Sequence, residues 1–294
     1  METGEGGVIE IASDTLTARI NPLGAELHSL TDAKSREHMS SGDPAFWRGR
    51  APLLFPIVGR LNGDVLRVEG QAYGLEKHGF ARRSQFEVIA HDASSALFRL
   101  NDSPATRAMY PFAFELDMHF ALNGATLAMT ATIRNPGNRP LPGSFGYHPA
   151  FAWPLPGADR TEHEIVFARD EPVSLRRVTP QGLIDGDPKV SPVTSDRFTL
   201  TDALFADDAL VWTDLNSRAL SYGVPSGPRL DIAFPDTPYL GIWTKPGAAF
   251  ICIEPWAGHA DPEGYVGEFR DKPGIVTIGA GVSRSFRMNV TVQT

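Results

Sequence analysis

The sequence predicts an all-β protein in which many short strands form a sandwich or a barrel. Short runs that alternate apolar with polar residues recur along most of the 294-residue chain. Turn-forming residues, 28 glycines and 24 prolines, separate these runs. No long stretch shows the periodicity of about 3.6 residues that marks an amphipathic helix, so a parallel sheet with crossover helices is not expected.

The first strands are expected near the start of the chain. Residues 8–11 and 16–20 form a first pair of short apolar runs. The segment Asn21-Pro-Leu-Gly24 follows, and its residue types favour a turn into a third strand at 26–30.

The clearest prediction is a long antiparallel hairpin. Apolar and polar residues alternate over 114–122, and the pattern resumes over 127–133. Asn123-Gly124 lies between the two runs and is the strongest short-range hairpin signal. One face of this hairpin should therefore lie in the core, and His119, on the opposite face, should have a structural or solvated role.

Further short runs bounded by turn residues complete the expected strands: 86–90, 96–100, 164–168, 197–200, 209–212, 229–234, 239–244, 250–253 and 275–278. The proline- and glycine-rich segment 180–192 is expected to be a long surface loop. We find no flexible linker, low-complexity tract or internal repeat, so residues 1–294 are interpreted as a single domain.

Composition and charge exclude several classes of partner. The net charge of -8 argues against nucleic acid and against an anionic membrane surface. No apolar run approaches the roughly 18 residues of a membrane-spanning helix. The single cysteine, Cys252, excludes an internal disulfide, and residues 1–7 lack the basic start and apolar core of a signal peptide. A cytoplasmic protein is expected, and its oligomeric state is left open.

Common cofactor and metal motifs are missing. The sequence has no G-x-G-x-x-G after a strand, no phosphate-binding loop of the Walker type, no H-E-x-x-H and no C-x-x-C. We therefore expect no cofactor and no metal ion. The serine-hydrolase motif G-x-S-x-G is also absent, and Cys252 within Phe-Ile-Cys-Ile is expected to be a buried apolar residue rather than a nucleophile.

The first candidate catalytic residue is Glu254, at the end of the apolar run Phe250-Ile-Cys-Ile-Glu-Pro-Trp256. If this run is a strand, Glu254 shares an apolar face with Phe250 and Cys252. A carboxylate there must find a partner, become protonated or hold a raised pKa, and a raised pKa suits a general acid or base near neutral pH. Pairing with an arginine at a strand end is the structural alternative.

Three other polar residues lie in apolar, turn-rich surroundings. Arg60 follows the apolar run 52–58, His78 precedes a glycine, and His148 precedes a proline. Glycine and proline favour irregular backbone, so both histidines should project from loops or strand ends, where functional residues are common. Taken alone, each histidine is also compatible with a structural role, and Arg60 with a buried ion pair.

Five segments together resemble the successive motifs of the aldose 1-epimerase (galactose mutarotase) family, and most closely its LacX-like branch. These segments are Pro52-Leu-Leu-Phe-Pro-Ile-Val-Gly-Arg60, His78-Gly-Phe-Ala-Arg82, Gly146-Tyr-His-Pro-Ala-Phe151, Tyr239-Leu-Gly-Ile-Trp-Thr-Lys-Pro246 and Cys252-Ile-Glu-Pro-Trp256. The resemblance implies a large antiparallel β-sandwich, galactose mutarotase-like, whose open concave sheet binds a small-molecule sugar.

The resemblance also implies roles for individual residues. Glu254 would act as the base on the anomeric hydroxyl of the sugar, and His148 would protonate the ring oxygen. The two groups would lie on opposite sides of C1. His78 and Arg60 would hold sugar hydroxyls. The sugar-contacting aspartate of the family matches Asp208 best, and its neighbour Asp207 is the rival.

The sugar itself is less well defined by the sequence. Four aromatic residues could supply an apolar face for stacking on the sugar and are equally compatible with the core: Trp243, Trp256, Tyr147 and Phe80. A related branch of the family acts on hexose 6-phosphates and would need extra cations, for which the candidates are Lys77, Arg82, Arg83 and Lys245. A binding protein that keeps the pocket without catalysis is the alternative from another functional class.

Overall fold

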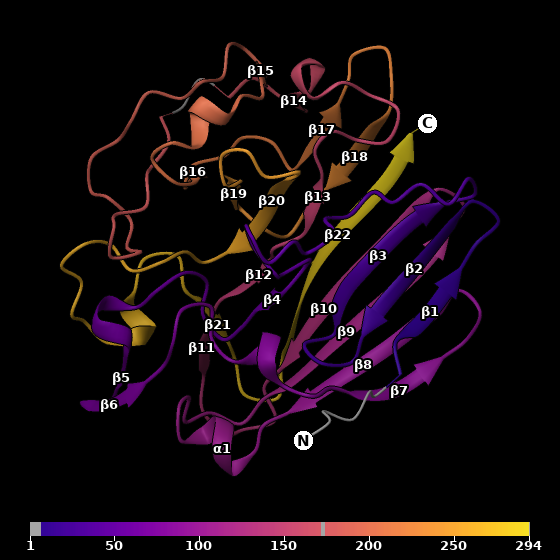
Figure 1. The fold of residues 1–294 in the computed structure, drawn as a ribbon. Helices are drawn as coiled ribbons and strands as arrows, with labels where there is room; N and C mark the ends of the chain where they lie inside the picture. The colour runs from indigo at the N-terminus through magenta and orange to yellow at the C-terminus, as the bar shows by residue number, and fades with distance from the viewer. Residues whose placement is uncertain (1–6, 172–173, 294) are drawn as a thin grey trace.

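The computed structural model describes residues 7–171 and 174–293, and Figure 1 shows that nearly all regular structure in them is β. Every named strand pair is antiparallel. The predicted all-β, antiparallel class is confirmed. Residues 1–6, on which most of the signal-peptide prediction rests, lie outside the described residues.

The largest unit is a nine-stranded sheet. Its strands, in spatial order, are β15 (Arg197–Thr199), β14 (Glu164–Phe167), β17 (Ala219–Gly223), β18 (Arg229–Ala233), β22 (Ser283–Gln293), β10 (Thr126–Arg134), β9 (Glu115–Asn123), β8 (Ser95–Asn101) and β7 (Glu87–His91). The predicted long hairpin is β9–β10, with Asn123 paired to Thr126 across the turn. Its alternate residues are buried as the pattern predicts, and His119 is exposed.

A six-stranded sheet forms the second layer. It contains β16 (Leu210–Trp212), β19 (Tyr239–Trp243), β20 (Phe250–Ala257), β12 (Phe145–Tyr147), β4 (Leu53–Leu54) and, also paired to β20, β13 (Ala150–Ala152). One face of these strands packs into the main core, which contains Leu53 and Trp212. The adjacent residues Leu54 and Val211 belong to a separate apolar cluster on the other face. Strand alternation therefore gives this sheet a second buried surface.

The side chain of Tyr147 connects the two layers. From β12 its hydroxyl donates to the carbonyl of Phe286 on β22 at 2.8 Å and accepts from the backbone N–H of Ala131 on β10 at 3.0 Å. The neighbouring ring of Phe145 stacks on Phe286 with 5.4 Å between centroids. These contacts fix the spacing between the layers next to His148.

Three small sheets complete the fold. A sheet of β1 (Ile9–Ala12), β2 (Leu16–Asn21) and β3 (Glu26–Asp32) packs on β8 and β9, and its strands agree with the three predicted near the start of the chain. The other two sheets have two strands each. One is the hairpin of β5 (Val65–Val68) and β6 (Gln71–Gly74), and the other pairs β11 (Leu141–Gly143) with the distant β21 (Val276–Ile278).

Helical structure is limited to single turns. Residues 7–171 and 174–293 contain one short α-helix, α1 (Pro104–Arg107), and the 3₁₀ turns Asn62–Asp64, Ala81–Arg83, Arg160–Glu162, Asp202–Phe205 and Phe269–Asp271. No helix in the described part of the chain has the length and apolar character needed to cross a membrane.

The structure corrects one sequence prediction and adds to another. The segment 180–192 lacks regular strands, as predicted, but Leu183 and Ile184 are buried, so it is not wholly a surface loop. Ile184 pairs with Pro262 in an isolated bridge, which draws the segment over the six-stranded sheet. The strand β22, the longest in the described residues, was not predicted, although its buried residues Phe286, Met288, Val290 and Val292 alternate regularly.

Candidate active site

A pocket of about 200 Å³ lies on the outer face of the six-stranded sheet. Residues from β16, β19 and β20 line its floor, and the walls come from loops, including Gly182 and Ile184 of the segment that folds over the sheet. Its lining combines apolar side chains with a few polar groups, which is typical of small-molecule sites. The pocket is therefore the natural place to look for the predicted site residues.

Glu254 lies in the floor because of the alternation along β20. Ile251 and Ile253 point into the main core, whereas Phe250 and Cys252 belong to an apolar cluster on the outer face. Glu254 lies on that outer face with 3% of its surface exposed, opposite Gly241 of β19. As predicted, one apolar face of the strand carries Phe250, Cys252 and Glu254.

The indole of Trp256 fits into a slot made by two glycines on neighbouring strands. A Cβ atom added to Gly241 on β19 would lie 2.4 Å from Cη2 of Trp256, and one added to Gly146 on β12 would lie 2.6 Å from its Cδ1. Neither glycine has a positive φ, so close approach of the ring explains both of them. Trp256 therefore lies flat against the sheet and forms part of the pocket floor.

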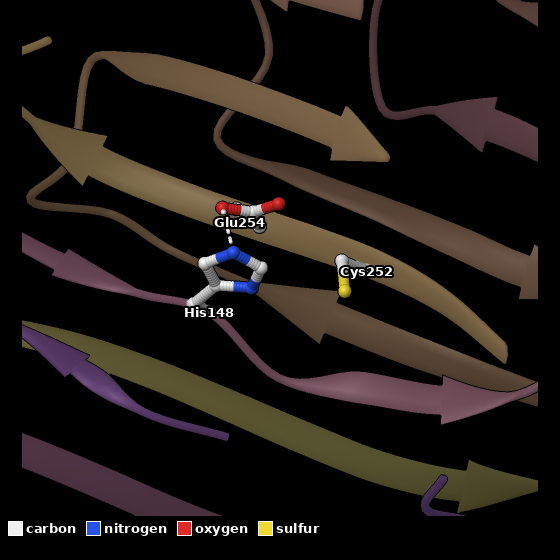
Figure 2. Close-up of side chains that lie close together, drawn as sticks. All are labelled: His148, Cys252 and Glu254. Atoms are coloured by element: carbon white, nitrogen blue, oxygen red, sulfur yellow. Dashed lines mark ion pairs between the residues drawn. The ribbon is translucent and has the colours of Figure 1, made fainter. Parts of the chain in front are cut away.

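His148 lies beside Glu254, although about a hundred residues separate them in sequence. His148 occupies the short break between β12 and β13, both of which pair with β20. Its Nε2 is 3.3 Å from Oε2 of Glu254, as Figure 2 shows. The two groups are in direct contact, and their expected placement on opposite sides of C1 stays a prediction.

Burial shifts the two groups in opposite directions. It raises the pKa of the Glu254 carboxyl well above its usual range, against the opposing effect of the Lys77 cation. It lowers the pKa of His148 to about 3, and Lys77 adds to this shift. The Trp256 indole N–H lies near the carboxylate and lowers its pKa slightly, although it makes no hydrogen bond of standard geometry. Both shifts favour the uncharged form of the group concerned.

His78 is held beside the pair by its own backbone and by Gly59. The backbone N–H of His78 donates to the Gly59 carbonyl at 2.8 Å, and its ring Nδ1 accepts from the Gly59 backbone N–H at 3.1 Å. Because Nδ1 accepts, the neutral ring carries its proton on Nε2. Burial lowers the pKa of His78 well below its usual value. The imidazole lines the pocket with its centroid 5.7 Å from that of His148.

The two candidate aspartates differ in position. Asp208 lines the pocket and, as a like charge, adds to the rise in the pKa of Glu254. Its backbone is left-handed, with φ of 67°, and its Oδ1 accepts from the Ala209 N–H at 2.7 Å. Asp207 is exposed and does not line the pocket. The geometry therefore favours Asp208 as the aspartate at the site.

The structure does not place Arg60 in the pocket lining. Its Nε lies 3.0 Å from Oδ1 of Asp64, and its Nη1 donates to the Gln181 carbonyl at 3.4 Å. The cations that do line the pocket are Lys77 and Arg82. Arg60 was predicted as a sugar ligand from its motif alone, and that motif does not indicate the ion pair with Asp64, four residues later.

Of the remaining candidates, some line the pocket and others do not. Trp243 lines it together with Trp256. Tyr147 and Phe80 are buried in the main core and do not line it. Arg83 pairs with Glu76 at 2.5 Å, and Lys245 is exposed outside the lining. Their sequence patterns do not distinguish a pocket face from a core face.

Trp47 lines the pocket, although no sequence pattern predicted it there. Trp47 comes from a short turn at 43–47 and stacks on the imidazole of His148, with centroids 4.8 Å apart and planes 26° apart. The only sequence signal was an aromatic pair, Phe46-Trp47, within a polar and glycine-containing stretch.

Metal-binding residue types also meet at this site. Ligand atoms of His148, Cys252 and Glu254 all lie within 4.8 Å of one another (Figure 2). However, burial and the neighbouring Glu254 raise the pKa of the Cys252 thiol well above its usual value, and a protonated thiol is a poor metal ligand. The arrangement fits an acid–base pair beside an apolar thiol better than a metal centre.

Comparisons with known proteins identify the family. The profile of the family described as aldose 1-epimerase matches residues 7–266. The chain belongs to the aldose 1-epimerase family. The chain is also 30% identical to the chromosomal protein LacX of Lactococcus lactis subsp. lactis over 283 residues, which cover 92% of this chain and 94% of that protein.

Solved structures of relatives agree with the family. A galactose mutarotase related enzyme from Lactobacillus acidophilus is 29% identical, with a TM-score of 0.91 and 98% of each chain covered. A galactose mutarotase-like protein from Lactobacillus casei is 28% identical, with a TM-score of 0.90, covering 98% of this chain and all of that one. The galactose mutarotase-like β-sandwich and the resemblance to the LacX-like branch are both confirmed.

Proposed function

We propose that this aldose 1-epimerase family member interconverts the α and β anomers of a hexose, with Glu254 and His148 as its acid–base pair. The observation that carries the proposal is the 3.3 Å contact between the two side chains in the floor of a sugar-sized pocket. Acid–base catalysis requires both groups within reach of the protons that they transfer. The family supports a sugar as the small-molecule substrate.

The reaction needs two proton transfers and no oxidant or reductant. Glu254 takes the proton of the O1 hydroxyl, C1 and O1 become a carbonyl, and the C1–O5 bond breaks with its electron pair moving to O5. His148 gives a proton to O5. Rotation about the C1–C2 bond presents the other face of the aldehyde, and the reverse transfers close the ring. Each transfer can contribute roughly 10²- to 10⁴-fold.

The adjacency of the pair suits this chemistry. O1 and O5 are both bonded to C1, so two groups that lie close together can reach both oxygens. The forward step requires Glu254 as a carboxylate and His148 as an imidazolium. The Lys77 cation favours the carboxylate form of Glu254 and disfavours the imidazolium form of His148, and the 3.3 Å contact allows a proton to pass between the two groups.

Other lining residues are placed to bind the sugar. We assign His78, with its proton on Nε2, and Asp208 to sugar hydroxyls, and Trp243 to the apolar face of the ring. Arg60 lies beside Gly182 at the edge of the pocket and would have to leave Asp64 to reach a hydroxyl. We therefore rank Arg60 below the lining residues as a sugar ligand.

A hexose 6-phosphate is the second candidate substrate, and a specific observation favours it. Lys77 and Arg82 line the pocket, and neither makes an ion pair with a carboxylate in residues 7–171 or 174–293. Burial also lowers the pKa of Arg82, as expected for a cation that is only partly hydrated and has no close counter-ion. A phosphate on the sugar would supply that counter-ion.

The test is anomer exchange measured by NMR. Freshly dissolved α-glucose, α-galactose and their 6-phosphates are followed with wild-type protein, Glu254→Gln and His148→Asn. Both variants should lose at least about 10²-fold in rate. Matched controls are Glu87→Gln and His119→Asn, which change exposed residues on the nine-stranded sheet. Binding of a sugar without faster exchange would favour a non-catalytic binding protein, and exchange that survives both substitutions would refute the assigned pair.

A further inference from the structure

The imidazole of His148 has no hydrogen bond that fixes its orientation. Its Nδ1 is buried, lies near its own backbone carbonyl and makes no hydrogen bond of standard geometry. Its Nε2 meets Glu254, the proposed catalytic partner. Catalytic histidines are usually held by a carboxylate or carbonyl at the nitrogen that does not react. Because the contact with Glu254 uses the reacting nitrogen, a second contact is needed to hold the ring while Nε2 exchanges its proton.

Aromatic rings surround the imidazole instead. Trp47 lies parallel to it at 4.8 Å, and the rings of His78 and Trp243 meet it edge-on at 5.7 and 6.2 Å. Trp243 also meets Trp47 edge-on at 5.7 Å. Trp47 is the only described ring stacked face to face on His148, so it is the one that restricts rotation of the imidazole plane.

The loop is built to hold Trp47 in this position. Asp43 begins a turn in which its carbonyl accepts from the N–H groups of Phe46 and Trp47, at 3.0 and 2.9 Å. A Cβ atom added to Gly49 would lie 2.4 Å from Cζ2 of Trp47. The indole thus folds back over a position that only glycine leaves open, and Gly49 has no positive φ that would otherwise explain it.

We propose that Trp47 is a positioning residue for His148. Its stacked ring fixes the orientation of the imidazole, as a hydrogen-bonded carboxylate or carbonyl does for most catalytic histidines. Its effect on turnover rests on the proposed epimerase function. Its effect on the orientation of the imidazole does not, because the contact is present in the free protein.

The experiment compares three variants with wild type. Trp47→Leu keeps an apolar side chain but removes the flat ring, Trp47→Phe keeps a smaller ring, and Gly49→Ala displaces the indole without removing an atom that can touch the sugar. Gly74→Ala is the matched control, because a Cβ atom there meets nothing within 4 Å. Two readouts are taken: kcat for anomer exchange, and the chemical shifts of the His148 ring protons in protein labelled at histidine.

We expect Trp47→Leu and Gly49→Ala to lower kcat by roughly 10- to 100-fold, the scale of loss when a reacting group is displaced by about 1 Å. Trp47→Phe should retain most of the activity, and Gly74→Ala all of it. The ring protons of His148 should lose the upfield shift caused by the indole in Trp47→Leu and Gly49→Ala, and should keep part of it in Trp47→Phe.

The outcomes separate this inference from the proposed function. Normal kcat in both Trp47→Leu and Gly49→Ala overturns the positioning role, and so does a Trp47→Phe variant no better than Trp47→Leu. If wild-type protein exchanges no sugar, the epimerase proposal fails on its own. The His148 shifts then still decide whether Trp47 orients the ring: shifts unchanged in Trp47→Leu and Gly49→Ala overturn it.

Discussion

Replacing Gly241 by alanine should destabilise the protein and deform the pocket floor together. The added Cβ would lie 2.4 and 2.5 Å from two carbons of Trp256, where carbon atoms prefer about 3.5–4.0 Å. The indole must therefore move by about 1 Å. It is only 7% exposed, and Gly146 lies close to its other side, so little room is available. Overpacking of this kind costs about 1–3 kcal/mol.

Urea unfolding and anomer exchange test this prediction. The midpoint of Gly241→Ala should fall with an unchanged slope, and its exchange rate should fall as well, because Trp256 lines the site. The matched variant Gly74→Ala, where a Cβ has open space, should be within about 0.5 kcal/mol of wild type. If Gly241→Ala has wild-type stability and exchange, the ring of Trp256 is not confined by the glycines and our account of the floor is wrong.

Three further predictions concern the site and its support. Tyr147→Phe leaves the Ala131 N–H in the core without its partner and should cost about 1–3 kcal/mol in the free energy of unfolding, measured by thermal or urea denaturation; an unchanged value would contradict the bridging role. The pKa of His148 is lowered from 6.5 to about 3, so below pH 6.5 the unfolded chain binds a proton at His148 that the folded chain does not bind, and the contribution of this residue to stability falls as pH falls, whereas the raised pKa of Glu254 acts in the opposite direction. At roughly pH 5 this costs about 2 kcal/mol, which His148→Asn should recover in urea midpoints compared between pH 7 and 5; equal pH dependence in both proteins would refute it. Cys252 is fully buried and its thiol pKa is raised, so iodoacetamide should label it only after unfolding, as mass spectrometry would show, and labelling of the native protein would disprove this.

The local sequence predicted those strands in which apolar and polar residues alternate regularly. The hairpin at 115–134 and the two faces of β20 follow from alternation alone, because each residue's neighbours in sequence fix which way it points. The strand β22 has the same alternation, from Phe286 to Val292, and could have been predicted in the same way.

Contacts between distant segments could not be predicted in this way. The resemblance to the family brought Glu254 and His148 together, but nothing in the sequence indicated that they touch. The stacking of Trp47 on His148 depends on how a separate loop folds over β20. The ion pair of Arg60 with Asp64 depends on the path of the backbone after Gly59, so a motif that names the arginine does not locate its guanidinium.

The place of β22 in the nine-stranded sheet constrains how the chain can fold. It lies between β18 and β10, so until Ser283–Gln293 has left the ribosome the sheet exists only as two halves. Each half then presents an unpaired edge, β18 or β10, that can template pairing with another chain. A nascent chain should therefore be most prone to aggregation while β22 is not yet available, and chaperones that shield strand edges should matter most in that interval.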